Sequence, residues 1–310
     1  MTYMRYMKQS IIIILVFFLR TFCAWSQIEL PDDFSPKDTE LYYIRLLTGE
    51  EYTGIIRDII EDDTQGTVLK VKLTIGTAEI PCSGIAELRP YKELYRHNHR
   101  LYLLPTADPI GDNYFIGNFE LLLLYVGVGY DRFSLTAGRT IIPGLSSADQ
   151  GSLVNLKATI YSEDNITMPG GFTLAVGTNV AWLNSANRLL HFYGTGTFTL
   201  TRTRLTMSMF YKQGRDDSFV ISGGRFGNFG VTYPNGALGL ALGFDTKFTA
   251  MNDVHVLCEL WNPDIAKPMN SGALLGLRIA NTHVAADFGL SVWTAPAIAP
   301  FVSFVWTPHW

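Results

Sequence analysis

Six stretches of this chain alternate between large apolar residues and small or polar ones, and this pattern limits the fold more than any other feature. In one of them, Leu238, Leu240, Leu242 and Phe244 alternate with two glycines, an alanine and Asp245. Successive side chains of a β-strand point to opposite faces, so each stretch predicts a strand with one apolar face. The other five stretches are 154–160, 172–182, 204–212, 273–279 and 284–292.

The second face of these strands favours a closed barrel over a soluble sandwich. A sandwich turns a solvated face rich in Lys, Glu and Thr outward. Here that face is mostly Gly, Ala, Ser and Thr, which suits a narrow lumen behind a lipid-facing wall. A charge on the lipid side costs about 2–4 kcal/mol near the midplane. The alternation directs these charged residues to the lumen: Lys157, Arg204, Asp245, Lys247, Glu259, Arg278 and Asp287.

Residues 299–310 form a further alternating stretch with an aromatic residue in the last position. Val302, Phe304, Trp306, Pro308 and Trp310 share one face, and the other face is mixed. This pattern resembles the closing strand of bacterial outer-membrane β-barrels, which acts as an assembly signal. The resemblance implies recognition by the barrel assembly machinery. We expect this strand to pair with the strand of Asp287 and with the first barrel strand, and to weaken near Pro308, which has no amide to donate.

Composition agrees with a β-rich protein that meets an apolar phase. Charged residues are 17% of the 310, below the usual quarter, and aromatic residues are 13%. A net charge of -4 leaves no electrostatic footprint for nucleic acid. The three cysteines, Cys23, Cys82 and Cys258, have neither the spacing of a zinc site nor that of a disulfide framework, and no cofactor is predicted.

Residues 1–26 predict a secretory signal peptide. Arg5 and Lys8 precede an apolar run over 11–19, and small residues at 24 and 26 fit cleavage before Gln27. The run is too short to cross a bilayer as a helix. An uncleaved anchor is the alternative, although Arg20 would then lie in hydrocarbon. Lipidation at Cys23 is disfavoured, because the position before it needs a small residue and is Phe22.

Residues 38–90 predict a small separate β module of five short strands. The residues Thr48, Gly49 and Glu50 are of types that favour a turn, and Gly54 predicts a bulge or bend in the strand that follows. The strand and glycine layout is similar to SH3-like or Sm-like modules. We expect a structural or protein-binding module in the periplasm, with a periplasmic protein as a candidate partner.

Residues 91–113 are predicted to link the module to the barrel. Residues 91–100 form the one basic patch, which we expect to meet anionic headgroups near the membrane. A metal site at His97 and His99 is the alternative, but no acidic or cysteine partner lies nearby in the sequence.

The barrel is predicted to span residues 114–310 with about twelve strands. Dividing the length of this segment by about sixteen residues for each strand and its connection gives about twelve strands. An even number of strands places both ends of the barrel on the same side of the membrane. Phe219–Gly223 and Phe229–Tyr233 are the ambiguous pair, and one bent strand is the favoured interpretation. Ten and fourteen strands stay open. Over residues 90–310 the chain thus resembles outer-membrane β-barrel proteins that carry a small periplasmic module.

The tryptophans provide a separate pattern, because each lies near the end of a predicted strand. Interfacial girdles of outer-membrane barrels place amphipathic rings there. We therefore predict a membrane-interface set formed by Trp182, Trp261, Trp293, Trp306 and Trp310.

The candidate site is a lumen cluster of charges on neighbouring strands: Asp245, Lys247, Glu259, Arg278 and Asp287. Opposite charges there could pair and fill the lumen, or form a constriction that selects a small polar solute. No catalytic residues are predicted, since no histidine has the serine two positions on that a lipid-A deacylase needs.

The sequence thus predicts an all-β, non-enzymatic outer-membrane protein in contact with outer-membrane lipid. It would be an envelope anchor or a small-solute channel. A lipid-active barrel enzyme and a soluble secreted β-rich binding protein are the alternatives.

Overall fold

The computed structural model describes residues 34–37, 40–63, 66–73, 75–91, 97–111, 114–120, 123–143, 146–147, 150–163, 171–182, 188–200, 202–222, 228–248, 254–280, 284–293 and 297–308. The predicted signal peptide and Trp310 lie outside these residues. The chain divides into two compact units, Met1–Leu94 and Tyr95–Trp310. Among the described residues, no helix is both long and apolar enough to cross a membrane.

Within its described part, the first unit is an antiparallel sheet of five strands in the order β4-β3-β2-β1-β5. Its core is a cluster of buried residues that includes Tyr42, Ile44, Ile56 and Leu69. The elements are β1 (Tyr42–Leu46), β2 (Glu51–Asp62), β3 (Gly66–Leu73), β4 (Gly76–Pro81), the short 3-10 helix η1 (Cys82–Gly84) and β5 (Ile85–Pro90).

Gly54 allows β2 to serve both halves of this small sheet. Residues 51–54 of β2 pair with β1, and residues 55–62 pair with β3. A methyl group at Gly54 would lie 2.6 Å from the carbonyl oxygen of Lys72 and from Cγ1 of Val71. The predicted bend at Gly54 therefore reflects a close approach of two strands. Gly49 has a φ of 90° in the predicted turn between β1 and β2.

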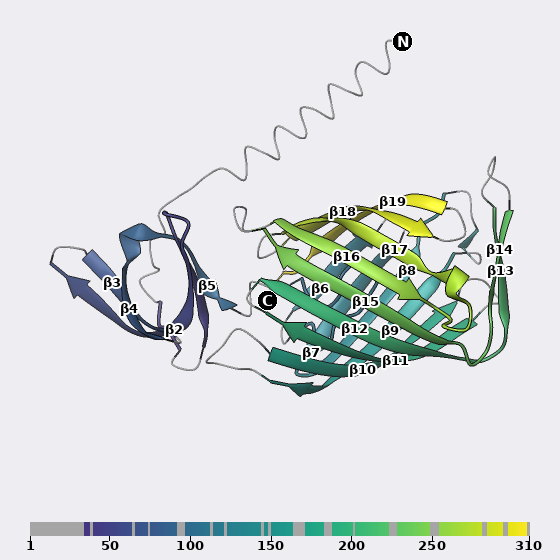
Figure 1. Cartoon of the computed structure of the whole chain (residues 1–310), viewed down its shortest axis with the longest axis horizontal. Coiled ribbons are helices and arrows are strands. Elements are labelled where there is room, and N and C mark those ends of the chain that lie inside the picture. Colours follow the sequence, from purple (N-terminus) through teal and green to yellow (C-terminus); the bar gives the residue numbers. More distant parts are fainter. Residues whose placement is uncertain are drawn as a thin grey trace, which may run out of the picture. The chain divides into compact units, whose positions relative to one another are not determined.

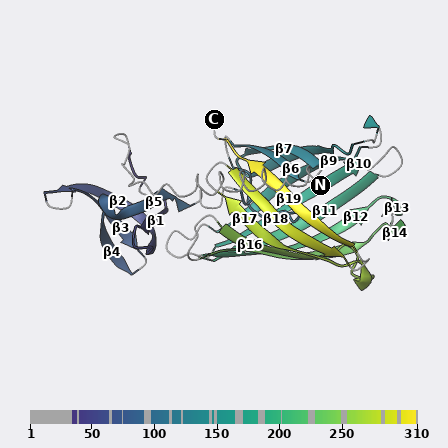
Figure 2. The same ribbon diagram turned by 90° about the horizontal axis from the view of Figure 1, so that it is seen from above.

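In the described part of the second unit, twelve antiparallel strands form a closed barrel (Figures 1 and 2). Each strand pairs with the next, and β19 closes the wall against β6 through pairs such as Trp306 with Gly117. The strands are β6 (Phe115–Glu120), β7 (Leu123–Tyr130), β8 (Phe133–Thr140), β9 (Ser152–Ser162), β10 (Gly171–Trp182), β11 (Arg188–Thr199), β12 (Thr203–Gln213), β15 (Leu238–Lys247), β16 (Val254–Asn262), β17 (Gly272–Ala280), β18 (Val284–Trp293) and β19 (Ala297–Trp306).

The predicted closing strand is confirmed. β19 pairs with β18, which carries Asp287, and with β6. It ends at Trp306, two residues before Pro308. We call the end of the barrel where β6 begins and β19 ends the entry end, and the opposite end the loop end.

The ambiguous pair of segments is not a bent barrel strand. β13 (Asp217–Ser222) and β14 (Asn228–Tyr233) pair with each other in a separate hairpin, and β12 pairs directly with β15. The hairpin projects at the loop end (Figure 1). The one-strand interpretation is therefore wrong, while the favoured number of twelve barrel strands is confirmed among the described residues.

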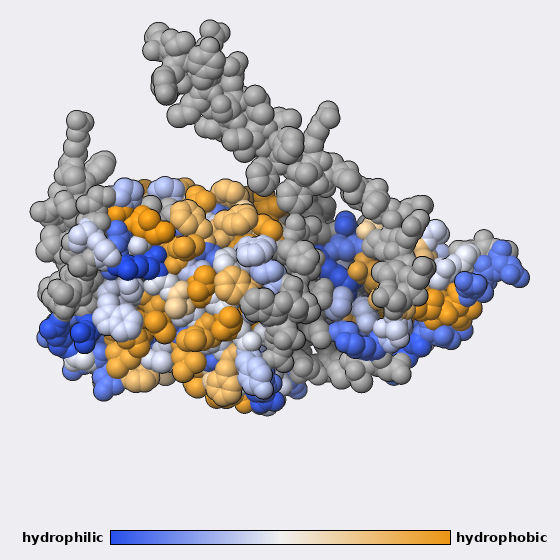
Figure 3. Space-filling model, turned by 180° about the vertical axis from the view of Figure 1, so that it is seen from behind, coloured by the Kyte–Doolittle hydropathy of each residue, from blue (hydrophilic) through white to orange (hydrophobic). Residues whose placement is uncertain are grey.

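The barrel wall is apolar on the outside, and Figure 3 shows hydrophobic side chains gathered over it. Most strands have 9–12 residues, the length that crosses a bilayer at a tilt. The predicted alternation is confirmed by exposed outward residues such as Leu156, Phe192, Met207, Leu242, Leu275, Leu290 and Phe304. This is the architecture of outer-membrane β-barrels, preceded by a separate small sheet, and the predicted fold class is confirmed.

Candidate functional site

The lumen is occupied by the chain's own residues 97–111, which we call the plug. Most plug side chains are buried, including His97, His99, Tyr102 and Ala107. Arg100 pairs with the buried Glu120 of β6 and lies over the ring of Tyr125, 4.4 Å from its centroid. For Arg100 the expectation of a cation facing headgroups is wrong, because it is paired inside the barrel. Residues 92–96 of the predicted basic patch lie outside the described residues.

The plug is a short hairpin whose tip is residues 101–104. Arg100 and Pro105 form an isolated antiparallel bridge. The amide of Leu101 donates to the carbonyl of Leu104 at 2.9 Å, and the amide of Thr106 donates to the carbonyl of His99 at 3.2 Å. The plug therefore turns back on itself inside the lumen.

Glu259 of β16 holds the tip. Its Oε1 accepts the amides of Tyr102, Leu103 and Leu104 at 2.6, 2.9 and 3.0 Å. The carboxyl is fully buried, so these three charge-assisted bonds replace its hydration. The amides of the tip are thereby satisfied as well.

Lys157 of β9 holds the base of the hairpin. Its Nζ donates to the carbonyls of His99, Thr106 and Asp108 at 3.0, 2.9 and 2.5 Å. Along the wall, β9 and β16 are separated by four strands on one side and six on the other. Lys157 and Glu259 therefore bind the plug from nearly opposite sides of the barrel.

Hydroxyl groups and a second cation add contacts around the rest of the plug. The amide of Ala107 donates to Oγ1 of Thr197 at 2.9 Å, and the amide of Ile110 donates to Oγ of Ser134 at 2.9 Å. Arg204 of β12 pairs with Asp108. Strands from all around the barrel therefore contact the plug.

Arg278 and Asp287 connect the wall to the plug. Nε and Nη2 of Arg278 donate to the carboxylate of Asp287 at 2.6 and 2.9 Å. Nη2 also donates to the carbonyl of Leu101 at 2.8 Å, and Nη1 donates to that of His97 at 3.4 Å. Ser303 of β19 donates to Asp287 at 2.8 Å.

The remaining two residues of the predicted lumen cluster, Asp245 and Lys247, lie on β15. Asp245 is buried, and its Oδ1 is 2.6 Å from Nδ1 of His255. Lys247 lies opposite His255 in the register of β15 and β16. The structure thus brings Glu259, Arg278 and Asp287 to the plug, while Asp245 pairs with His255.

Sequence reasoning placed Lys157 and Arg204 in the lumen but did not include them in the site. A signal existed for Lys157. Its neighbours across the sheet are Ser134 and Gly177, and neither is charged. An inward charge without a cross-strand partner needs another group to satisfy it, and here that group is the plug.

The tryptophans divide between the two faces of the wall. Trp182 and Trp306 point outward and are exposed. Trp261 and Trp293 have the same parity as the inward residues Glu259 and Asp287, and they lie opposite each other across Gly272. Their ring centroids are 3.8 Å apart. The structure therefore places these two rings in the lumen instead of an outward girdle.

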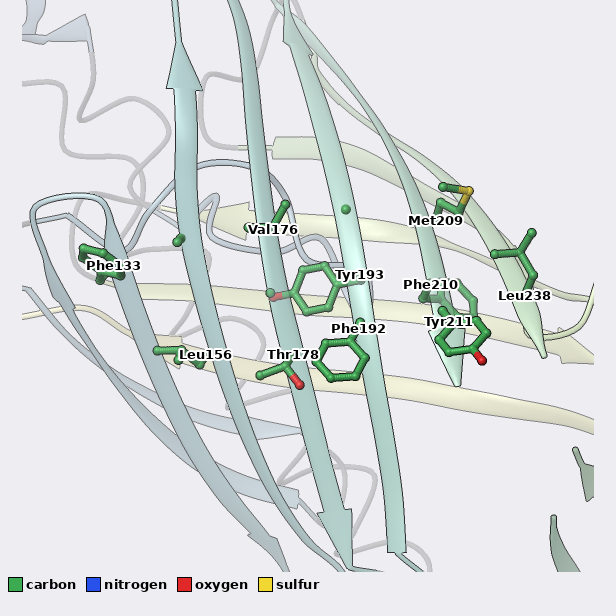
Figure 4. A pocket seen from close by; sticks show the side chains of 13 residues that line it. Phe133, Leu156, Val176, Thr178, Phe192, Tyr193, Met209, Phe210, Tyr211 and Leu238 are labelled. Atoms are coloured by element: carbon green, nitrogen blue, oxygen red, sulfur yellow. The ribbon is translucent and has the colours of Figure 1, made fainter. Parts of the chain in front are cut away.

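The outer wall carries an apolar depression of about 520 Å³ near Gly194 (Figure 4). Val176, Phe192, Met209 and Tyr211 are among the side chains around it. Its lining residues are mostly aliphatic and aromatic, and they include no serine, cysteine, histidine or carboxylate. Among the described residues, no group of three or more His, Cys, Asp or Glu could hold a metal ion.

No protein-family model matches the chain, and no curated protein matches it. Its structure is similar to that of the KdgM porin, with 10% identity over 63% of this chain and 98% of that one and a TM-score of 0.44. The NanC porin has 9% identity over 63% and 97%, with a TM-score of 0.37. OccK5 (OpdH) of Pseudomonas aeruginosa has 9% identity over 87% and 96%, with a TM-score of 0.34. These likenesses concern the fold alone.

Proposed function

We propose that this protein is an outer-membrane barrel that anchors its N-terminal module in the periplasm, with the lumen closed by the plug. The observation that carries this proposal is the grip of Glu259 and Lys157 on the plug backbone. Both side chains are buried, and their charged groups hydrogen-bond to the plug backbone. The main role of these inward charges is therefore to bind the plug. The outward apolar wall supports insertion in the outer membrane.

The predicted partners follow from this role. Residues 299–310 serve as the signal for the barrel assembly machinery, and the module recruits a periplasmic protein. The apolar wall contacts outer-membrane lipid.

The first test is fractionation with heat-modifiable gel migration and planar-bilayer recording. We expect extraction only with detergent, a faster-migrating folded form in unheated samples, and almost no conductance steps. Protein that stays in solution without detergent would favour the soluble binding alternative. Frequent steps from the unmodified protein would favour an open small-solute channel, and lipid hydrolysis would favour the enzyme.

A pair of cysteine variants tests whether the plug is docked in the membrane. Leu103 at the tip is 44% exposed, whereas the neighbouring Leu101 is 2% exposed. With Cys23, Cys82 and Cys258 replaced by serine, Leu103→Cys should react with a charged thiol reagent at least about ten times faster than Leu101→Cys, because only the first side chain is reached by water. Equal labelling rates would contradict a docked plug.

A further inference from the structure

We propose that the plug is releasable: residues 97–111 leave the lumen as a hairpin through the entry end and convert the closed barrel into a conducting one. The proposal rests on the membrane-barrel assignment made above. It goes beyond anchoring, because it gives the barrel a second, open state.

The path of the chain makes release possible without threading. His97 at one end of the plug contacts Arg278, two residues from the entry end of β17. Ile110 at the other end contacts Ser134, the second residue of β8, which begins at the entry end. Both ends of the hairpin therefore leave by the same mouth, and the hairpin can withdraw as a unit.

The wall does not need the plug in order to stay closed. Every barrel strand pairs with its two neighbours, and the plug contributes no strand to this ladder. The described hydrogen bonds of the plug join side chains of the wall mainly to backbone atoms of the plug, and its apolar side chains pack in two lumen clusters around Leu101 and Ile110. Water can replace such polar bonds after release, so withdrawal does not strand buried charges in a dry lumen.

Two glycines on the inward face of the wall allow the tip of the plug to pack closely against it. A methyl group at Gly276 would overlap the hydroxyl of Tyr102, and one at Gly289 would lie 3.2 Å from it. The Tyr102 ring packs edge-on against Phe301, with centroids 4.7 Å apart. The tip itself carries the exposed Leu103, so space remains beyond it toward the loop end.

Release also changes the reach of the module. While docked, the 15 residues 97–111 are folded into the lumen. Once free, they add about 50 Å of extended chain between the module and β6. A load or a partner that extends the module therefore favours the open barrel, and a docked plug favours a short connection.

The experiment combines a weakened plug with a locked one in the full-length chain, with Cys23, Cys82 and Cys258 replaced by serine. Lys157→Met removes three bonds to plug carbonyls, and we expect the open fraction in planar bilayers to rise about ten-fold or more. Ala107→Cys with Thr197→Cys forms the lock. The amide nitrogen of Ala107 is 2.9 Å from Oγ1 of Thr197, which brings the two positions within reach of a disulfide.

Combining the lock with Lys157→Met should abolish conductance after oxidation and restore it after reduction. Each single cysteine variant in the Lys157→Met background is the control, and its conductance should not differ between oxidised and reduced samples. Conductance that persists in the oxidised lock would overturn the proposal, because current would then bypass the plug.

If Lys157→Met does not fold, Glu259→Gln replaces it, since it keeps the shape of the side chain and removes the charge. The absence of conductance steps from Lys157→Met or Glu259→Gln, when the variant is folded and inserted in the membrane, would also overturn the proposal. Failure to extract with the membrane or to show a heat-modifiable form would instead refute the membrane barrel, so the two failures are distinguishable.

Discussion

Glycines on the inward face of the wall set how closely the plug can approach it. Gly276 lies directly under Tyr102, and an added methyl group would overlap the Tyr102 hydroxyl and the carbonyl oxygen of Phe288. Gly194 is also on a barrel strand, but it faces outward, and a methyl group there would meet no atom within 4 Å. A glycine is therefore required for close packing at Gly276 on the inward face, whereas a larger residue would fit at Gly194 on the outward face.

Gly276→Ala should lower the stability of the folded barrel by about 1–3 kcal/mol, because the overlap forces either the plug or the neighbouring strand to move. Gly194→Ala should change it by less than about 0.5 kcal/mol. Urea midpoints followed by tryptophan fluorescence would measure both. A destabilised Gly194→Ala with an unaffected Gly276→Ala would contradict the placement of these two faces.

Single residues also explain which parts of the site sequence reasoning missed. Tyr102 and Glu259 are 157 positions apart, and no local pattern in residues 97–111 announces burial. The basic residues of 91–100 predicted a linker at the lipid headgroups, because the partner of Arg100, Glu120 of β6, could not be identified from a local pattern. Trp261 was assigned to the membrane interface from its place at a strand end, whereas its parity with Glu259 already indicated the lumen.

At the scale of elements, the strands followed from the sequence because a two-residue period is local and strict. Leu240 and Leu242 face outward, and Ala241 and Asp245 face inward, as the alternation predicts. The hairpin of β13 and β14 did not follow, because its residues have the same propensities as barrel strands. What separates it from the wall is the direct pairing of β12 with β15.

Lys212 joins this hairpin to the barrel. Its Nζ is 2.9 Å from Oδ2 of the buried Asp217, and it donates to the carbonyls of Tyr233 and Arg215 at 2.9 and 2.6 Å. The Lys212 side chain is fully buried, whereas that of Arg215 is 62% exposed, with its Nε 3.6 Å from Oδ1 of Asp217. The buried cation therefore sets the position of the hairpin base.

Lys212→Met should leave Asp217 buried beside a weak partner and destabilise the hairpin base by about 3–5 kcal/mol. We expect proteinase K to cut within residues 214–237 at least about ten times faster, while the barrel stays heat-modifiable. Arg215→Met is the matched control and should cut at the rate of the parent, because exposed ion pairs contribute about 0–1 kcal/mol. Faster cutting in the control alone would contradict the assignment.

At the scale of the whole molecule, the chain combines two units with separate cores. The module has its own buried cluster around Ile56 and Leu69, and the barrel has lumen clusters around Leu101 and Ile110. Among the residues that the structure describes, none belongs to both kinds of cluster, so loss of one core need not unfold the other unit. This separation is what an anchored module requires.

The separation predicts that the module can be unfolded while the barrel remains closed. Ile56 is fully buried in the module, and truncation of such a side chain costs about 2–5 kcal/mol, a large share of the stability of a small unit. Ile56→Ala should therefore make the module sensitive to limited proteolysis, while the barrel keeps its heat-modifiable migration and the plug keeps the lumen silent in planar bilayers.

Ile75 provides the control, because its side chain is 96% exposed in the same module. Ile75→Ala should leave both units intact. If Ile56→Ala also abolished heat-modifiable migration, the two units would share one folding transition. If it raised the conductance while the barrel stayed folded, the folded module itself would help to keep the plug docked. An unfolded module adds slack to the connection and exerts no pull on the hairpin, so we expect the barrel to stay closed.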